Sequence, residues 1–205
     1  MAATITERAA AISIYGNAFI VGGVLMGFEM LGSRYLYPYF GGGIGTWAGL
    51  ISTVLCALAI GYFAGGAIVD RYPSPRVLAL AIAVAAGYLA LVPPNADHVM
   101  EGLLHALGAG PAGILAAAAA LLLLPLSLLG MLSPIAIRLL IQSTEESGRI
   151  SGLVYGISTI GSVFGTLFTT FTLIPALGSR AITYVYAAVL AACATSLFLL
   201  AKKPG

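Results

Sequence analysis

The chain has 205 residues, of which 60% are hydrophobic and only 8% are charged, and its mean hydropathy is +1.04. This small number of polar side chains cannot cover a water-soluble globule. Most of the surface must therefore face lipid. The net charge is +2 and the nine Lys and Arg residues form no stripe, which argues against nucleic acid as a partner. We therefore expect a single integral membrane domain covering residues 1–205.

Six apolar stretches are long enough to cross a hydrocarbon core, which needs roughly 20 residues. We predict an all-α integral membrane protein with spans at about 11–31, 46–69, 76–93, 112–139, 150–174 and 180–201. The first run is too long for the core of a signal peptide, so we expect it to stay in the mature protein. Most basic residues fall at the termini and in the second and fourth connections, which predicts a bacterial-type inner membrane protein with both termini cytoplasmic.

Glu29 falls near the outer end of the first span, where a carboxylate is costly unless it is paired, protonated or facing a wet cavity. Arg34 follows five residues later, about 140° round a helix, so an ion pair between the two requires the helix to end or bend near Gly32. Two interpretations stay open. Either the pair fixes the end of this helix, or Glu29 belongs to a substrate or proton site.

Aromatic and glycine residues mark the first external segment. The aromatic side chains suit an interfacial belt at headgroup level, and they are Tyr35, Tyr37, Tyr39, Phe40 and Trp47. A glycine-rich run follows at Gly41–Gly45. Because no strand precedes it, we expect a hinge or tight re-entry and not a phosphate-binding loop.

Small residues recur every four positions in two spans, which lets helix backbones approach closely. They are Ala57, Gly61 and Gly65 in the second span, and Gly152, Gly156, Gly161 and Gly165 in the fifth. Packing within the chain and a dimer seam both explain this spacing. At the end of the second span, Asp70 and Arg71 are candidates for a gate or for a solvated helix cap.

The segment Asn95–Gly110 carries polar residues at helical spacing, which predicts a short amphipathic helix lying on the membrane. Asp97, Glu101 and His105 share one face, but such a face is more typical of solvent contact than of a metal site. Cys56 and Cys193 lie inside apolar runs, where thiols usually behave as small hydrophobes. We predict no metal site, no disulfide and no cofactor.

The fourth span contains two prolines, Pro125 and Pro134, the second directly after Ser133 and four residues before Arg138. A proline removes a main-chain donor and clashes with the preceding turn, so we expect a kinked or broken helix. Broken helices in transporters often line binding sites, although membrane helices also tolerate proline for packing alone.

Three strings run in order over nearly the whole chain. They are Glu29-x4-Arg34-x-Leu36-x-Pro38-Tyr39-Phe40-Gly41, then Ser133-Pro134-x3-Arg138-Leu139, then Gly148-Arg149-x-Ser151-Gly152-x2-Tyr155-x2-Ser158-Thr159-x-Gly161-Ser162-x2-Gly165-Thr166. These strings resemble the membrane domain of spermidine-synthase-like membrane proteins, also called fused major facilitator/spermidine synthase proteins. The Gly65–Arg71 segment also resembles the signature between the second and third helices of major facilitator transporters, although Tyr72, Pro73 and Ser74 depart from it.

The resemblance implies half of a major facilitator transporter, built from two repeats of three helices. Such a half needs a second half to enclose a path, which predicts a homodimer or a partner membrane subunit in contact with lipid. The nucleotide loop and catalytic carboxylate of the family's soluble synthase domain are not found in this sequence, so we expect no enzyme activity.

The leading hypothesis is a half-size, transporter-like protein that binds or moves a small solute, a cationic one included, or a lipid. Candidate path or gate residues are Glu29, Arg34, Asp70, Arg71, Ser133, Pro134, Arg138 and Arg149. The rival hypothesis is a non-transporting subunit or assembly factor that docks on a larger membrane complex through its small-residue faces.

Overall fold

The computed structural model describes residues 5–141 and 143–201, and every regular element in these ranges is a helix. In chain order the elements are α1 (Ile5–Phe40), α2 (Ile44–Arg71), α3 (Pro75–Leu107), α4 (Pro111–Ala118), the π-helix η1 (Ala119–Leu123), α5 (Leu124–Gly130), α6 (Leu132–Leu140), the 3-10 helix η2 (Thr144–Glu146), α7 (Ser147–Phe168), the π-helix η3 (Thr169–Leu173), α8 (Ile174–Leu177) and α9 (Ser179–Leu200).

These elements make six stretches that are long and apolar enough to cross a membrane. They are Arg8–Phe40, Ile44–Arg71, Pro75–Leu107, Pro111–Leu140, Thr144–Leu177 and Ser179–Leu200. The predicted six-helix membrane fold is therefore confirmed. The first five stretches are longer than predicted, and the sixth has the predicted length of 22 residues. The first is about 50 Å long at 1.5 Å per residue, so its ends extend beyond a hydrocarbon core about 30 Å thick.

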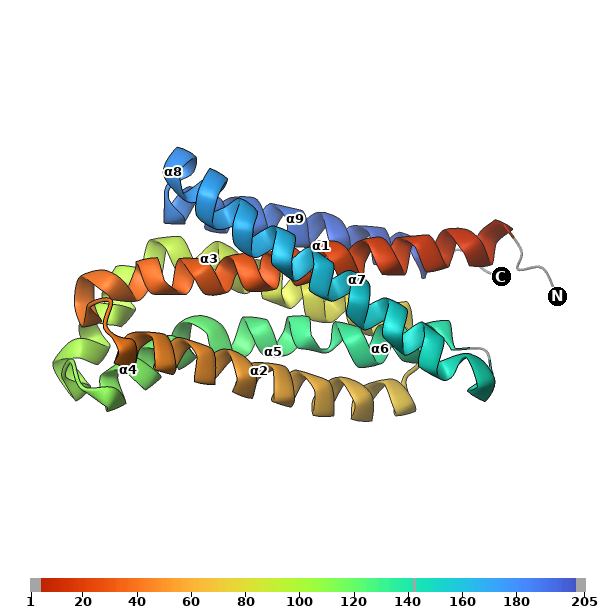
Figure 1. Cartoon of the computed structure of the whole chain (residues 1–205), viewed down its shortest axis with the longest axis horizontal. Helices are drawn as coiled ribbons and strands as arrows, with labels where there is room; N and C mark the ends of the chain where they lie inside the picture. Colours follow the sequence, from red (N-terminus) through yellow and green to blue (C-terminus); the bar gives the residue numbers. More distant parts are fainter. Residues whose placement is uncertain (1–4, 142, 202–205) are drawn as a thin grey trace.

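The six spans alternate in direction (Figure 1). The start of α1, the α2–α3 and α6–α7 connections and the end of α9 lie at one end of the bundle. We call this the basic end, because it carries Arg8, Arg71, Arg76, Arg138 and Arg149. The other end, called the opposite end, holds the α1–α2, α3–α4 and α8–α9 connections. The tight turn expected after the first span is present there, with Gly41 at a φ of 72°.

Helix packing follows a simple scheme, with α1 against α7 and α9, α3 against α9 and α5, and α2 along α4, η1, α5 and α6 (Figure 1). Glycine allows the closest approaches. A Cβ at Gly61 would lie 2.3 Å from the Ser127 carbonyl oxygen, and one at Gly161 would lie 2.0 Å from that of Phe19. Gly61, Gly161 and Gly165 therefore serve packing within the chain, on the α2–α5 and α1–α7 contacts, whereas Gly152 and Gly156 meet no neighbour.

The first span does not end or bend near Gly32, as an ion pair of Glu29 with Arg34 would require. Instead α1 continues to Phe40 and includes Pro38. Gly32 is used for packing, since a Cβ there would lie 3.1 Å from the Leu50 side chain of α2.

The predicted amphipathic helix on the membrane surface is also wrong, because α3 runs without interruption from Pro75 to Leu107 through Pro93 and Pro94. Buried Ala96 and Met100 hold this last part of α3 against the bundle. The Asn95 side chain donates to the Leu91 carbonyl (2.8 Å), next to the turn that the two prolines weaken.

The fourth span is interrupted as its prolines predict. The π-helix η1 ends two residues before Pro125. Further along, α5 ends at Gly130 and α6 begins at Leu132, with only Met131 between them. The fifth span has a similar interruption that we did not predict, since η3 comes just before Pro175. In both spans the wider π turn leaves room for the proline ring next to the preceding turn.

Candidate functional site

Two pockets follow one another along the seam between α1, α2 and the α7–η3 span. The central chamber, of about 200 Å³, lies near the middle of the bundle, and its polar lining includes Tyr62, Ser133, Tyr155, Ser158, Thr159 and Ser162. The end chamber, of about 350 Å³, lies at the opposite end, and its polar lining includes Ser33, Arg34, Tyr37, Thr46, Trp47 and Thr170. We call the two chambers together the groove.

Hydroxyl groups recur every three or four residues along α7, so they share one face of the helix. They belong to Ser151, Tyr155, Ser158, Thr159, Ser162 and Thr166. The Ser162 hydroxyl donates to the Ser158 carbonyl (2.9 Å) and lies 3.2 Å from the Gly22 carbonyl of α1. Several of these hydroxyls line the central chamber, so α7 supplies most of its polar wall.

The span that contains α7 is also the least buried of the six. Only 17% of its most apolar segment is buried, against 56% for the fourth span. Tyr155 and Tyr62 are 45% and 39% exposed at the mouth of the central chamber. Lipid tails offer no hydrogen bonds, so a hydroxyl-bearing face on an exposed span suits water, a solute or another protein better than lipid.

Glu29 is buried in this seam, with 8% of its surface exposed. It lies three residues after Met26, which lines the central chamber, and four before Ser33, which lines the end chamber. Glu29 therefore lies on α1 at the level between the two chambers, although it is part of the lining of neither. Among the described residues no ion pair and no side-chain hydrogen bond reaches its carboxylate, whose oxygens are not themselves fully buried.

Arg34 is exposed and lines the end chamber beside the Tyr37 and Trp47 side chains. It forms no ion pair with any described residue, Glu29 included. The interpretation of Glu29 and Arg34 as a pair that fixes the helix end is therefore wrong. Because α1 is continuous, the two side chains point in different directions, and only Arg34 lines the end chamber.

The remaining predicted site residues divide between the groove and the basic end. Ser133 is buried and lines the central chamber, whereas Pro134 packs 3.0 Å from the Cβ position of Gly65. At the basic end lie Asp70, Arg71 and Arg138, all exposed, and Arg149, whose guanidinium pairs with Glu146 at 3.3 Å. Gly152 and Gly156 are exposed, and a Cβ at either position would meet nothing within 4 Å.

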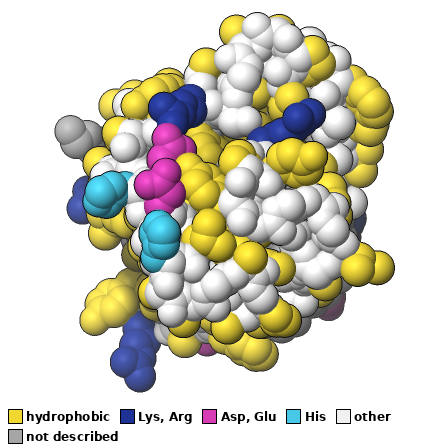
Figure 2. Space-filling view, turned by 90° about the vertical axis from the view of Figure 1, so that its left-hand side faces the viewer, with side chains coloured by type: hydrophobic (Ala, Val, Ile, Leu, Met, Phe, Trp, Pro, Cys, Tyr) yellow, Lys and Arg dark blue, Asp and Glu magenta, His cyan; other side chains and the backbone are white. Residues whose placement is uncertain are grey.

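A charged cluster lies at the opposite end, outside the groove. Arg180 of α9 donates to Asp97 of α3 and so joins the two helices. Acidic side chains and a basic side chain lie side by side on this end face (Figure 2). Among the described residues no group of three or more His, Cys, Asp or Glu side chains could hold a metal ion.

None of the comparisons with family models, curated proteins and solved structures finds a match. The resemblance to spermidine-synthase-like membrane proteins thus stays a prediction from the motifs.

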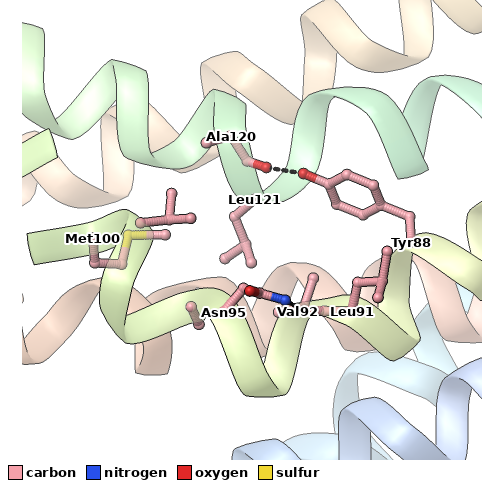
Figure 3. Close-up of a pocket in the computed structure, with 9 residues that line it drawn as sticks. Tyr88, Leu91, Val92, Asn95, Met100, Ala120 and Leu121 are labelled. Carbon is pink, nitrogen blue, oxygen red and sulfur yellow. Dashed lines mark hydrogen bonds between the residues drawn. The ribbon is translucent and has the colours of Figure 1, made fainter. Parts of the chain in front are cut away.

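A third pocket, of about 140 Å³, lies between α3 and η1 (Figure 3). Its wall is mostly apolar, with Leu121 and Met100 facing each other across it. Tyr88 closes one side by donating its hydroxyl hydrogen to the Ala120 carbonyl of η1. In the hydrogen-bond register of a π-helix this carbonyl would need an N–H from Pro125, which has none. Tyr88 supplies the missing donor.

The hydroxyl face of α7 was missed at the level of sequence, together with Tyr62 of α2. The signal was present in the three- and four-residue spacing of Ser158, Thr159, Ser162 and Thr166. The glycines of the same span were identified instead, and of these Gly161 and Gly165 pack against α1.

Proposed function

We propose that this chain is a half-size, transporter-like protein of a bacterial-type inner membrane. It pairs with a second copy and binds or moves a small, positively charged solute along the groove. The observation that carries the proposal is the position of Glu29, buried between two polar chambers and without a cationic partner among the described residues. The positive-inside rule supports cytoplasmic termini, since basic residues concentrate at the basic end.

The charge of Glu29 supports a cationic solute. An ionised carboxylate away from bulk water is costly, and a proton or a bound cation removes most of that cost. The hydroxyls of the central chamber can accept hydrogen bonds from an ammonium group and so replace the water molecules that hydrate it in solution. Apolar residues such as Met26 and Leu58 would contact the carbon chain of an amine.

The exposure of α7 supports a second copy. In a two-fold dimer the same face of each chain meets its counterpart, so α7 would pack near α7 of the partner. Gly152 and Gly156 present backbone without side chains on the exposed surface and would allow close approach there. Two open grooves would then face one another and enclose one path between the copies. The resemblance to half of a major facilitator transporter, with its repeats of three helices, supports the same arrangement.

The basic end supplies the proposed gate. Asp70, Arg71 and Arg138 are exposed there, close to the end of the α2 and α6 helices, and Arg149 follows at the start of α7. Opposite charges on neighbouring helix ends can form ion pairs in one state of a transporter and break them in another.

Currents from proteoliposomes adsorbed on a solid-supported membrane would test the proposal. The purified protein is exposed to concentration jumps of primary alkylamines and polyamines. We expect a saturable current for at least one amine, and its loss in Glu29→Gln. The control variant is Glu145→Gln, which removes an exposed carboxylate at the basic end and should leave the current unchanged.

The proposal would be contradicted if folded Glu29→Gln and parent proteins gave identical binding and currents. Stoichiometric co-purification with a larger complex, together with indifference to Glu29→Gln, would instead support the docking-subunit hypothesis.

A further inference from the structure

The two π-helices are alike in sequence position, because one residue separates each from a following proline, Pro125 or Pro175. In η3 the Ile174 N–H donates to the Thr169 carbonyl, which is the five-residue register of a π-helix. The next carbonyl in that register belongs to Thr170. Its donor would be the N–H of residue 175, and proline has none.

The equivalent carbonyl in the fourth span is that of Ala120, and Tyr88 donates to it from α3. The fifth span has no such replacement, because no described side chain donates to the Thr170 carbonyl. A main-chain carbonyl without a donor is costly inside a membrane unless a ligand or water supplies one. Thr170 lines the end chamber, so the residue with the open carbonyl is part of the chamber wall.

The same chamber contains a cation and aromatic rings. Arg34 lines it without an ion pair to any described residue, and Tyr37 and Trp47 add aromatic surface suited to the level of lipid headgroups. Guanidinium groups bind phosphate and carboxylate oxygens through paired hydrogen bonds. The chamber therefore offers a donor for an anion and an acceptor for an N–H or O–H group.

We propose that the end chamber binds a zwitterionic group of the phosphoethanolamine type, with its anionic oxygens on Arg34 and its ammonium hydrogens on the Thr170 carbonyl. This inference rests on the proposed function, because the end chamber is the mouth of the same groove, and it adds a class of ligand. A lipid headgroup and a free solute share this chemistry.

Native mass spectrometry and titration distinguish the two sources. The protein is reconstituted in nanodiscs of equal parts phosphatidylethanolamine and phosphatidylcholine, and the lipids retained after release are counted. Phosphatidylcholine carries the same phosphate, but its quaternary ammonium has no hydrogen to donate. In parallel, free O-phosphoethanolamine is titrated into the detergent-solubilised protein and its binding is measured by calorimetry.

Two variants and a matched control locate the binding. Arg34→Gln removes the anion partner, and Pro175→Ala supplies an N–H that occupies the carbonyl. Each should weaken binding about tenfold or more, as loss of a charge-assisted hydrogen bond does. Pro125→Ala makes the same change in the other π-helix, away from the end chamber, and should leave binding unchanged.

Preferential retention of phosphatidylethanolamine that both variants abolish identifies a lipid headgroup, whereas saturable binding of O-phosphoethanolamine with the same sensitivity identifies a free solute. Equal retention of both lipids with no titration signal, or binding indifferent to Arg34→Gln and Pro175→Ala, overturns the inference. Arg34→Gln and Pro175→Ala are assessed by binding and Glu29→Gln by amine currents, so failure here is distinguishable from failure of the proposed function.

Discussion

Gly165 of α7 lies so close to Gly23 of α1 that a Cβ at position 165 would be 2.1 Å from the Gly23 carbonyl oxygen. Backbone cannot move aside as the end of a flexible side chain can. We predict that Gly165→Ala lowers the free energy of unfolding by about 1–3 kcal/mol, the usual cost of overpacking. Thermal unfolding in detergent, followed by circular dichroism, would measure it.

Gly148→Ala is the matched control, because it lies on the same helix and its Cβ would meet nothing within 4 Å. It should unfold at the parent temperature or slightly above, since alanine favours helix over glycine. Equal destabilisation by both substitutions would show that α7 does not pack on α1 as described.

The hydrogen bond from Tyr88 to the Ala120 carbonyl gives a second prediction. Tyr88→Phe leaves that carbonyl without a donor, and we expect a loss of about 0.6–2 kcal/mol, the range for hydrogen bonds within membrane proteins. Pro125→Ala provides an N–H in the same place. In the double variant Tyr88→Phe should therefore cost less than it does alone. Strictly additive effects in this double-mutant cycle would contradict the assigned role of Tyr88.

Water in the groove gives a third prediction. Thr159→Cys places a thiol in the central chamber, whereas Ile160→Cys places one on an exposed apolar position of the same helix, 63% exposed in the parent chain. In a Cys56→Ser background, a charged methanethiosulfonate should label Thr159→Cys several times faster, because the reactive thiolate forms in water and not among lipid tails. Equal rates would argue against a hydrated groove.

Hydropathy predicted the six spans because a bilayer imposes length and apolarity on every crossing segment. It did not predict where they end. Proline and glycine are the usual signs of a helix end, yet α3 continues through Pro93 and Pro94, and α1 continues through Gly32. In α3 the packing of buried Ala96 and Met100 against the bundle offsets the weakened turns, and such packing cannot be known before the fold.

The candidate site was predictable in part. Glu29, Arg34 and Ser133 were identified because charges and broken helices are costly in a membrane. Arg34 and Ser133 line the groove, and Glu29 is buried on α1 at the level between its two chambers. Of the two interpretations left open for Glu29, the pair with Arg34 was wrong, since the partner of a side chain depends on which helices pack beside it. The hydroxyls of α7 were missed because serine and threonine are common in spans as ordinary hydrogen-bonding groups.

The central claim is that two copies meet through the α7 face, and oxidative cross-linking in native membranes at natural expression level tests it most directly. Gly156→Cys in a Cys56→Ser background would be treated with copper phenanthroline, with Leu80→Cys on the exposed side of α3 as control. The account predicts a cross-linked dimer for Gly156→Cys and none for Leu80→Cys. Absence of a dimer for Gly156→Cys, or cross-linking to a different protein in its place, would contradict it.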